Sequence, residues 1–275
     1  MIETPTLFDI GVNLLHPQFD VDREDVLARA RDQGVAGMLV TSTSIESTIQ
    51  NIAYCQPRGL HCTAGIHPHD ASGAGADFAE HLLALARAPC VKAIGETGLD
   101  FNRNFSPAEV QRSVFSAQIE VAIESRLPLF VHDRDSAGET AERLAGAADR
   151  LSAVVVHCFT GTEADLSRYL ALGFCIGITG WICDRRRGGR LRELVTRIPI
   201  DALLIETDAP FLLPGNTPAD WHATHAVAAP RRRNEPALLH FVVEEIARLR
   251  RESPAFIAEQ TRNNALRLLQ IPEPG

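Results

Sequence analysis

Eight short runs rich in Val, Ile and Leu recur along this 275-residue chain, and their ends lie about 28 residues apart. Longer amphipathic stretches separate the runs, and this alternation is typical of repeated β-α units with parallel strands. Eight such units fit a closed α/β barrel of roughly 250 residues, the (β/α)8 or TIM barrel. The expected strands are 7–12, 36–41, 61–66, 91–96, 128–132, 153–157, 173–178 and 203–208.

An open, doubly wound sheet is the alternative fold for alternating strands and helices. Such a sheet is expected to carry a Gly-rich phosphate loop after its first strand. The segment 13–19, NLLHPQF, contains no glycine, so the barrel is favoured. No linker or change in composition divides the chain, and we expect one barrel domain over residues 1–275.

Several helices are predicted from the residues at their ends. One is expected from Asp22 to Gln33, where Gly34 follows as a stop signal. Ser106 reads as the N-cap of another, with Pro107 at its first position and Glu109 completing a capping box. Two further helices are expected, one opened by Asn234-Glu235-Pro236 and one over about 254–269.

Composition limits the environment and the partners of the chain. No apolar run approaches the ~20 residues of a membrane span, and the N-terminus lacks a signal-peptide pattern. The six cysteines show no disulfide or CxxC spacing, so we expect a cytoplasmic protein without a membrane partner. The net charge of −8 argues against a general nucleic-acid coat protein but allows a local basic patch. A monomer is expected because no exposed apolar stripe stands out.

Four polar residues, Glu96, His132, His157 and Asp208, each close one of the apolar runs. One such residue alone is more often a hydrogen-bonded structural group. The carboxyl ends of parallel barrel strands meet at one mouth, however, so four of them together indicate an active site. Imidazole and carboxylate groups suit Zn²⁺, Mn²⁺ or Fe²⁺ better than Ca²⁺, and a mixed set also holds Mg²⁺ loosely.

Several longer motifs run in order along the chain. They are GIHPHD (65–70), GETGLDF (95–101), HDRD (132–135), HCFTGT (157–162), GITGW (177–181), ETDAPFLLP (206–214) and RRNEP (232–236). These motifs resemble those of the TatD family of metal-dependent deoxyribonucleases, and the resemblance extends from residue 8 to about residue 267, which is nearly the whole chain. It implies a TIM barrel of the amidohydrolase type, 3′-5′ exonuclease activity on DNA, and a Mg²⁺-type cofactor.

Carried over by motif, the metal ligands of this family correspond to Glu96, His132, His157 and Asp208. The first strand departs from the family pattern, since most members have an HxH pair where this chain has Gly11 and Asn13. Glycine supplies no ligand, and asparagine supplies at best a weak carbonyl. We therefore expect one firmly held metal ion and a second that is weak or arrives with the substrate.

Phosphodiester hydrolysis needs an activated water, neutralised phosphate oxygens and help for the leaving oxygen. Asp208 is the candidate general base, and Glu96 belongs to the same catalytic set as a metal ligand. His67 or His69 is expected to contact the phosphate or to protonate the leaving group. Their HPH spacing leaves open which of the two points inward.

Arginines in segments that follow strands are the candidate contacts to DNA phosphates. These are Arg103, Arg134, Arg185 and Arg232, the last two within the runs 185–187 and 231–233, and Asn13 joins them as a substrate contact. Trp181 and Phe101 are candidates for stacking on bases at a single-strand end, with loop packing as the alternative. An HxxH pair, His222 and His225, is expected in a loop outside any helix.

The sequence thus predicts a metal-dependent DNA hydrolase, a 3′-5′ exodeoxyribonuclease acting on single-stranded DNA or frayed 3′ ends. Mg²⁺ is the expected cofactor, with Mn²⁺ or Zn²⁺ open. One alternative keeps the metal chemistry but changes the bond, as in a D-aminoacyl-tRNA deacylase. Another alternative is a barrel that binds nucleic acid without catalysis, which the altered first strand would suit.

Overall fold

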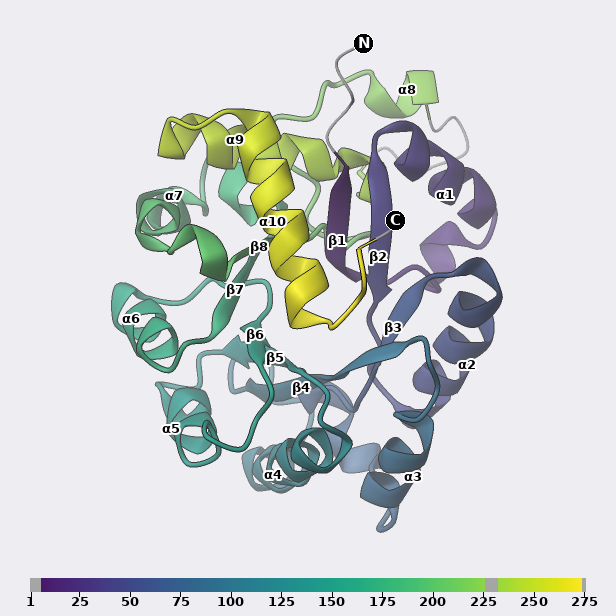
Figure 1. Cartoon of the computed structure of the whole chain (residues 1–275), viewed down its shortest axis with the longest axis vertical. Helices are drawn as coiled ribbons and strands as arrows, with labels where there is room; N and C mark the ends of the chain where they lie inside the picture. The colour runs from purple at the N-terminus through teal and green to yellow at the C-terminus, as the bar shows by residue number, and fades with distance from the viewer. Residues whose placement is uncertain (1–5, 226–231, 274–275) are drawn as a thin grey trace. The chain divides into compact units, whose positions relative to one another are not determined.

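The computed structural model describes residues 6–225 and 232–273. Eight strands follow one another in the order β1 to β8, their pairs are parallel, and helices separate them, so the predicted (β/α)8 fold class is confirmed (Figure 1). The strands are β1 Leu7–Val12, β2 Val35–Val40, β3 His61–Ala64, β4 Val91–Asp100, β5 Leu129–Arg134, β6 Val154–Val156, β7 Cys175–Ile178 and β8 Leu203–Ile205.

The helices occupy the connections between strands. The α-helices are α1 Arg23–Asp32, α2 Ile45–Cys55, α3 Phe78–Leu85, α4 Ala108–Ser125, α5 Glu139–Ala145, α6 Glu163–Ala171, α7 Gly189–Leu194, α8 Trp221–His225, α9 Leu239–Arg250 and α10 Pro254–Leu268. Short 3-10 helices are η1 Pro17–Phe19, η2 Gln56–Arg58, η3 Pro68–Gly73, η4 Gly180–Cys183, η5 Val195–Arg197, η6 Ile200–Ala202 and η7 Pro236–Leu238. None of the helices in the described ranges has both the length and the apolar character to cross a membrane.

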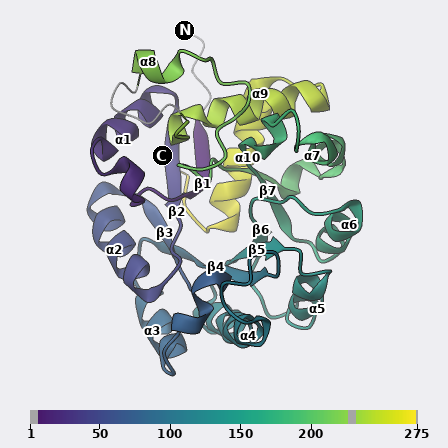
Figure 2. The same cartoon turned by 180° about the vertical axis from the view of Figure 1, so that it is seen from behind.

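Two compact units divide the chain, one formed by 39–176 with 266–275 and the other by 1–38 with 177–265. In the first unit, α2 to α6 lie around the outside of strands β3 to β6 (Figure 1), and Figure 2 shows the same elements from behind. Strands β5 and β6 are buried over Leu129–Val131 and Val154–Val156. Such unbroken apolar runs are what a parallel strand covered on both faces requires.

Strand β4 contains a bulge beside the predicted site. Ile94 pairs with Leu129, but the next pair is Thr97 with Val131, so β4 has one extra residue here. Such a bulge redirects a side chain and is common next to active sites. The strand then continues to Asp100, which corrects the expected end at Glu96.

Glycine makes this close pairing of β4 and β5 possible. Gly95 and Gly98 have φ values of +146° and +140°, a region that side-chain-bearing residues rarely adopt. A Cβ atom on Gly98 would lie 1.9 Å from the carbonyl oxygen of His132. His132 itself lies inside β5, which ends at Arg134 rather than at the expected residue 132. The other two predicted strand ends also shift, since His157 follows β6 directly and Asp208 lies three residues beyond β8.

The second unit contains β1, β8, α1 and α9. The backbone N–H groups of Asp208 and Asn13 donate to the carbonyl oxygens of Gly11 and Ala209, both at 2.8 Å, and hold the segment after β8 beside the end of β1. A buried ion-pair network also lies here, in which the Arg233 guanidinium contacts Asp22 and Glu235 at 2.7 Å each. Arg233 is only 1% exposed, so its expected place in a surface run 231–233 is wrong.

Two local predictions differ from the structure. The N-cap of α4 is Pro107 rather than Ser106. Ser106 is buried, and its hydroxyl accepts a hydrogen bond from the Ser72 N–H at 2.9 Å and donates to the His69 carbonyl at 2.8 Å. The HxxH pair was expected outside a helix, but residues 221–225 form the short helix α8. The first predicted helix is confirmed, since α1 has Asp22 and Gln33 as its caps.

Candidate active site

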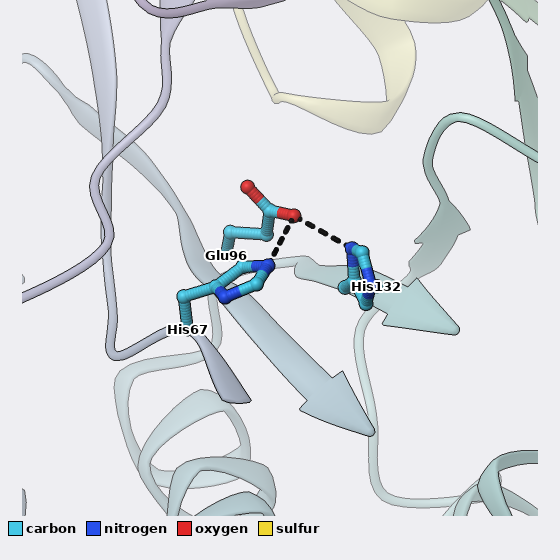
Figure 3. A group of neighbouring side chains, drawn as sticks. All are labelled: His67, Glu96 and His132. Atoms are coloured by element: carbon cyan, nitrogen blue, oxygen red, sulfur yellow. Dashed lines mark hydrogen bonds and ion pairs between the residues drawn. The ribbon is translucent and has the colours of Figure 1, made fainter. Parts of the chain in front are cut away.

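Three histidines surround one carboxylate oxygen in the unit 39–176. The Oε1 atom of Glu96 lies 3.2 Å from His67 Nε2, 2.9 Å from His132 Nδ1 and 2.7 Å from His157 Nε2. Figure 3 shows the rings of His67 and His132 directed at this oxygen. Glu96, His67 and His157 are buried, and His132 is nearly so. The structure therefore brings together three of the four predicted strand-end residues, Glu96, His132 and His157, and adds His67.

The backbone around His67 fixes the direction of its ring. His67 is the N-cap of η3, and its Nδ1 atom accepts a hydrogen bond from the His69 N–H at 3.0 Å. Pro68 opens the 3-10 turn. Because Nδ1 is the acceptor, Nε2 carries the proton of a neutral imidazole and faces Glu96. Burial lowers the pKa of His67, although Glu96 opposes this effect.

His69 has a different carboxylate partner. Its Nε2 atom lies 2.6 Å from Oδ2 of Asp100, the last residue of β4. The other carboxylate oxygen of Asp100 accepts hydrogen bonds from the N–H groups of Asn102 and Arg103, at 3.0 and 2.9 Å. The HPH motif thus serves two groups, with His67 in the Glu96 cluster and His69 on Asp100.

Asp100 was not among the residues singled out from the sequence. It lies four residues after Glu96 on the same strand, and alternate residues of a strand share a face. That spacing could have identified Asp100 if the strand had been predicted to continue beyond residue 96. The Oδ2 atom of Asp100 also lies 3.4 Å from His132 Nε2, so it contacts two of the histidines.

Electrostatics keep both carboxylates ionised. Burial by itself would raise the pKa of Glu96, but His157, His67 and His132 together hold it well below its ordinary value. Burial opposes ionisation of Asp100 too, yet the nearby His132 and the hydrogen bonds from the Arg103 N–H and His69 lower its pKa. Burial lowers the pKa of His132, but Asp100 and Glu96 outweigh it and the net shift is upward. The site thus concentrates two carboxylates and four imidazoles.

The donor set fits a divalent metal ion. One ligand atom from each of His67, Glu96 and His132 lies within 4.8 Å of the others. The Nε2 atom of His132 is buried and has no hydrogen-bond partner of acceptable geometry within the described residues. A buried polar atom without a partner is costly, and coordination would satisfy it. Mixed imidazole and carboxylate ligands are typical of Zn²⁺, Mn²⁺ and Fe²⁺ sites.

Asp208 and Asn13 lie in the other unit, 1–38 with 177–265, and contact each other there. The Asn13 amide donates a hydrogen bond to Oδ1 of Asp208 at 2.9 Å. Asp208 has φ +53°, a left-handed conformation that turns the chain after β8. Behind this pair, Thr207 donates from its N–H and its hydroxyl to the buried Asp9 carboxylate, at 2.9 and 2.5 Å. Burial raises the pKa of Asp9 to about 7 despite these hydrogen bonds.

The predicted phosphate contacts are exposed or partly exposed. Arg103 follows β4, and Arg134 ends β5 as the register partner of Asp100. Neither guanidinium makes an ion pair within residues 6–225 and 232–273. Arg185 and Arg232 belong to the other unit and are exposed.

The aromatic residues expected to stack on bases already have partners. The Arg187 guanidinium lies 4.2 Å from the centre of the Trp181 ring, and Arg187 is paired with Asp184. The Arg112 guanidinium lies 5.0 Å from the centre of the Phe101 ring. Only the backbone is described for His222 and His225.

Comparisons with known proteins agree with this geometry. The family model of TatD related DNase matches residues 8–270. The protein named 3′-5′ ssDNA/RNA exonuclease TatD from Pectobacterium parmentieri is 46% identical over 96% of this chain and 100% of its own length. Its namesake from Dickeya dadantii is 46% identical over 98% of this chain and 100% of its own length.

Solved structures point the same way. The crystal structure of a TatD homolog from Escherichia coli superposes with a TM-score of 0.85 at 28% identity, covering 97% of this chain and 98% of that chain. A hydrolase TatD family protein from Entamoeba histolytica superposes with a TM-score of 0.83 at 26% identity, covering 96% of this chain and 98% of that chain. The chain therefore belongs to the TatD related DNase family.

Proposed function

We propose that this protein is a metal-dependent hydrolase of nucleic-acid phosphodiester bonds that removes nucleotides from the 3′ ends of single-stranded DNA. Its curated relatives carry the name 3′-5′ ssDNA/RNA exonuclease, which supports this activity and its direction. The observation that carries the proposal is the convergence of His67, His132 and His157 on Oε1 of Glu96. A hydrophobic core that serves stability alone would not place three imidazoles around one buried carboxylate.

Residues of this cluster would hold the metal ion, with Glu96, His132 and His157 as ligands and His67 beside them. Asp208 is proposed as a further ligand and as the general base on the strength of its sequence motif. A bound divalent ion supplies a more acidic water and neutralises charge on the phosphate. We propose Mg²⁺ as the cofactor, with Mn²⁺ and Zn²⁺ as the ions to compare.

The pair of His69 and Asp100 is suited to proton transfer to the leaving oxygen. His69 is 27% exposed, so it can reach a substrate, whereas Asp100 is buried behind it. A carboxylate in that position holds the imidazole in a fixed orientation. Arg103 and Arg134 are proposed to neutralise phosphate oxygens near this pair. Arg185, Arg232 and Asn13 are proposed as further substrate contacts.

The remaining features of the proposal concern the molecule as a whole. We propose a single domain because the family match runs through residues 8–270 without a break. We also propose that the protein acts as a monomer in the cytoplasm. Size-exclusion chromatography with light scattering tests the first of these two features, and cell fractionation tests the second.

The activity is tested on 5′-labelled single-stranded DNA with Mg²⁺, Mn²⁺, Zn²⁺ or a chelator. We expect a ladder of products shortened from the 3′ end, weaker cleavage of blunt duplex, and none in chelator. Glu96→Gln should abolish cleavage, while Glu120→Gln, which changes an exposed pair with Arg150, should not. Cleavage that persists in chelator would exclude the metal mechanism. Deacylation of a D-aminoacyl-tRNA without any DNA or RNA cleavage would replace the nuclease with an ester hydrolase, and binding alone would indicate a non-catalytic barrel.

A further inference from the structure

The loop after β4 exposes a phenylalanine beside the His69-Asp100 pair. Phe105 is 65% exposed, and its ring lies edge-on to the His69 ring with 4.8 Å between ring centres. Single exposed apolar side chains are common on protein surfaces and need no explanation. Phe105 differs because its ring contacts a histidine that we place in the catalytic site.

Hydrogen bonds hold this loop in place. Asp100, which binds His69, also accepts the N–H groups of Asn102 and Arg103. The Asn104 side chain donates to the Phe101 carbonyl at 2.7 Å, which closes the turn. Ser106, the residue after Phe105, is buried, and its hydroxyl donates a hydrogen bond to the His69 carbonyl. The turn that contains Phe105 is therefore hydrogen-bonded to His69 at both of its ends, through Asp100 and through Ser106.

A positive charge accompanies the exposed ring. The Arg103 guanidinium lies 6.0 Å from the centre of the Phe105 ring and has no acidic partner within the described chain. Arg112, on the following helix, is paired with Glu109 and Glu139 instead. An exposed aromatic ring next to an unpaired cation is the combination that single-stranded nucleic-acid sites use, since the ring stacks on a base and the cation meets a phosphate.

Other aromatic rings and a cavity beside His69 fit a base less well. Arg187 already covers Trp181, and Arg112 lies against Phe101. A cavity of about 630 Å³ also reaches His69, but carboxylates of Glu46, Asp70 and Asp77 line it and would repel the backbone phosphates of DNA. The loop with Phe105 combines an open ring with a positive charge.

We propose that Phe105 stacks on an unpaired base beside the scissile phosphodiester, while Arg103 pairs with a phosphate of the same strand. The proposal rests on the proposed nuclease function and names the device by which that site selects single strands. Stacking is tolerant of sequence because every base has a π-face, but the base must leave any duplex to reach the ring. The preference for single-stranded ends therefore comes from Phe105, independently of base identity.

The test combines variants of Phe105 with oligo-dT substrates that carry one abasic nucleotide at one of the three 3′-terminal positions. We expect Phe105→Ala to raise KM about tenfold with kcat nearly unchanged. An abasic nucleotide at the stacking position should cost the wild type about the same factor, and Phe105→Ala should lose nothing further on that substrate. Phe105→Trp should keep the wild-type KM. Phe256→Ala, at a 37% exposed phenylalanine on α10, is the matched control and should change nothing.

Each outcome decides the matter. If Phe105→Ala has the same KM as Phe256→Ala, Phe105 does not stack on a base and the inference is overturned. The inference is also overturned if the loss from Phe105→Ala and the loss from the abasic nucleotide multiply at all three positions. Both results require that the wild type cuts DNA, so they leave the nuclease function intact. If the wild type cuts no DNA with any metal, the proposed function fails and this inference fails with it.

Discussion

The Nε2 atom of His69 lies 2.6 Å from Oδ2 of Asp100, whereas the Nε2 atom of the neighbouring His67 faces Oε1 of Glu96 at 3.2 Å. Two histidines only two residues apart therefore face two different carboxylates. His67 is buried among the candidate metal ligands, while His69 is partly exposed. Substitutions at His67 and at His69 should therefore change different properties, metal affinity for His67 and the rate of cleavage for His69.

We expect His67→Gln to weaken Mn²⁺ binding, because it removes the imidazole that positions the carboxylate of Glu96, a proposed metal ligand. His69→Gln should leave Mn²⁺ affinity close to that of the wild type and lower kcat roughly 10²-fold, as the loss of a general acid does. Isothermal titration with Mn²⁺ and steady-state cleavage of single-stranded DNA measure the two effects. An equal loss of metal affinity in both variants would show that the separation of roles is wrong.

Glu96→Gln keeps the shape of the side chain but removes its charge. The three imidazoles around Oε1 would then face a neutral amide, and we expect Mn²⁺ affinity to fall roughly 10²-fold or more, because ionised ligands supply much of the attraction for a divalent ion. The midpoint of thermal unfolding, measured without metal, should change little in comparison with this loss of metal affinity. Near-wild-type affinity for Mn²⁺ would remove Glu96 from the set of ligands.

Asp100→Asn tests the carboxylate that binds His69 at the end of β4. Its Oδ1 atom can still accept the N–H groups of Asn102 and Arg103, so the loop should remain folded. The charge that orients His69 and approaches His132 is lost, and partners of this kind typically account for about 10- to 100-fold in activity or metal affinity. We expect kcat to fall by such a factor with a smaller change in KM. Asp135→Asn, on the exposed partner of Asn102, serves as the control.

The sequence was sufficient for the repeated strands because apolar runs separated by amphipathic segments are a local signal. It was also sufficient for His132 and His157, which lie at or close to the ends of short buried runs. The bulge at Glu96 could not be predicted, since it depends on how closely β4 approaches β5. Asp100 was missed for the same reason, because a strand expected to end at Glu96 does not include residue 100.

Charge gave the weakest guidance from sequence alone. Arg233 belongs to an arginine run and was expected on the surface, yet it is buried against Asp22, which lies 211 residues away in the chain. No local pattern reveals a partner at that separation. The exposure of Phe105 and the arginine cover over Trp181 are likewise properties of loops, whose conformation depends on tertiary contacts.

Gly98→Ala should destabilise the site strand. The added Cβ atom would lie 1.9 Å from the carbonyl oxygen of His132, and the φ of +140° disfavours alanine, so β4 and β5 would have to separate. We expect a loss of order 3 kcal/mol in the free energy of unfolding, together with weaker metal binding. Gly73→Ala, where no atom lies within 4 Å of the new methyl group and φ is not positive, is the matched control. Equal urea midpoints for the two variants would contradict this account.

The buried network around Arg233 predicts how stability depends on pH. Its hydrogen bond to Asp22 is the main reason that the pKa of Asp22 lies below the ordinary 3.8, against the opposing effect of burial. A depressed pKa means that Asp22 stabilises the fold above the pKa of the unfolded chain, and that this contribution is lost as pH falls through the folded-state value. We therefore expect Asp22→Asn to lower the free energy of unfolding by about 2–3 kcal/mol near pH 7, because it leaves a buried guanidinium short of one charge. The difference from the wild type should shrink as pH falls below about 4.

Urea unfolding near pH 7 and below pH 4 measures this difference, with Asp20→Asn at an exposed carboxylate as the control. A difference that stays constant with pH would show that Asp22 acts through packing rather than through its charge.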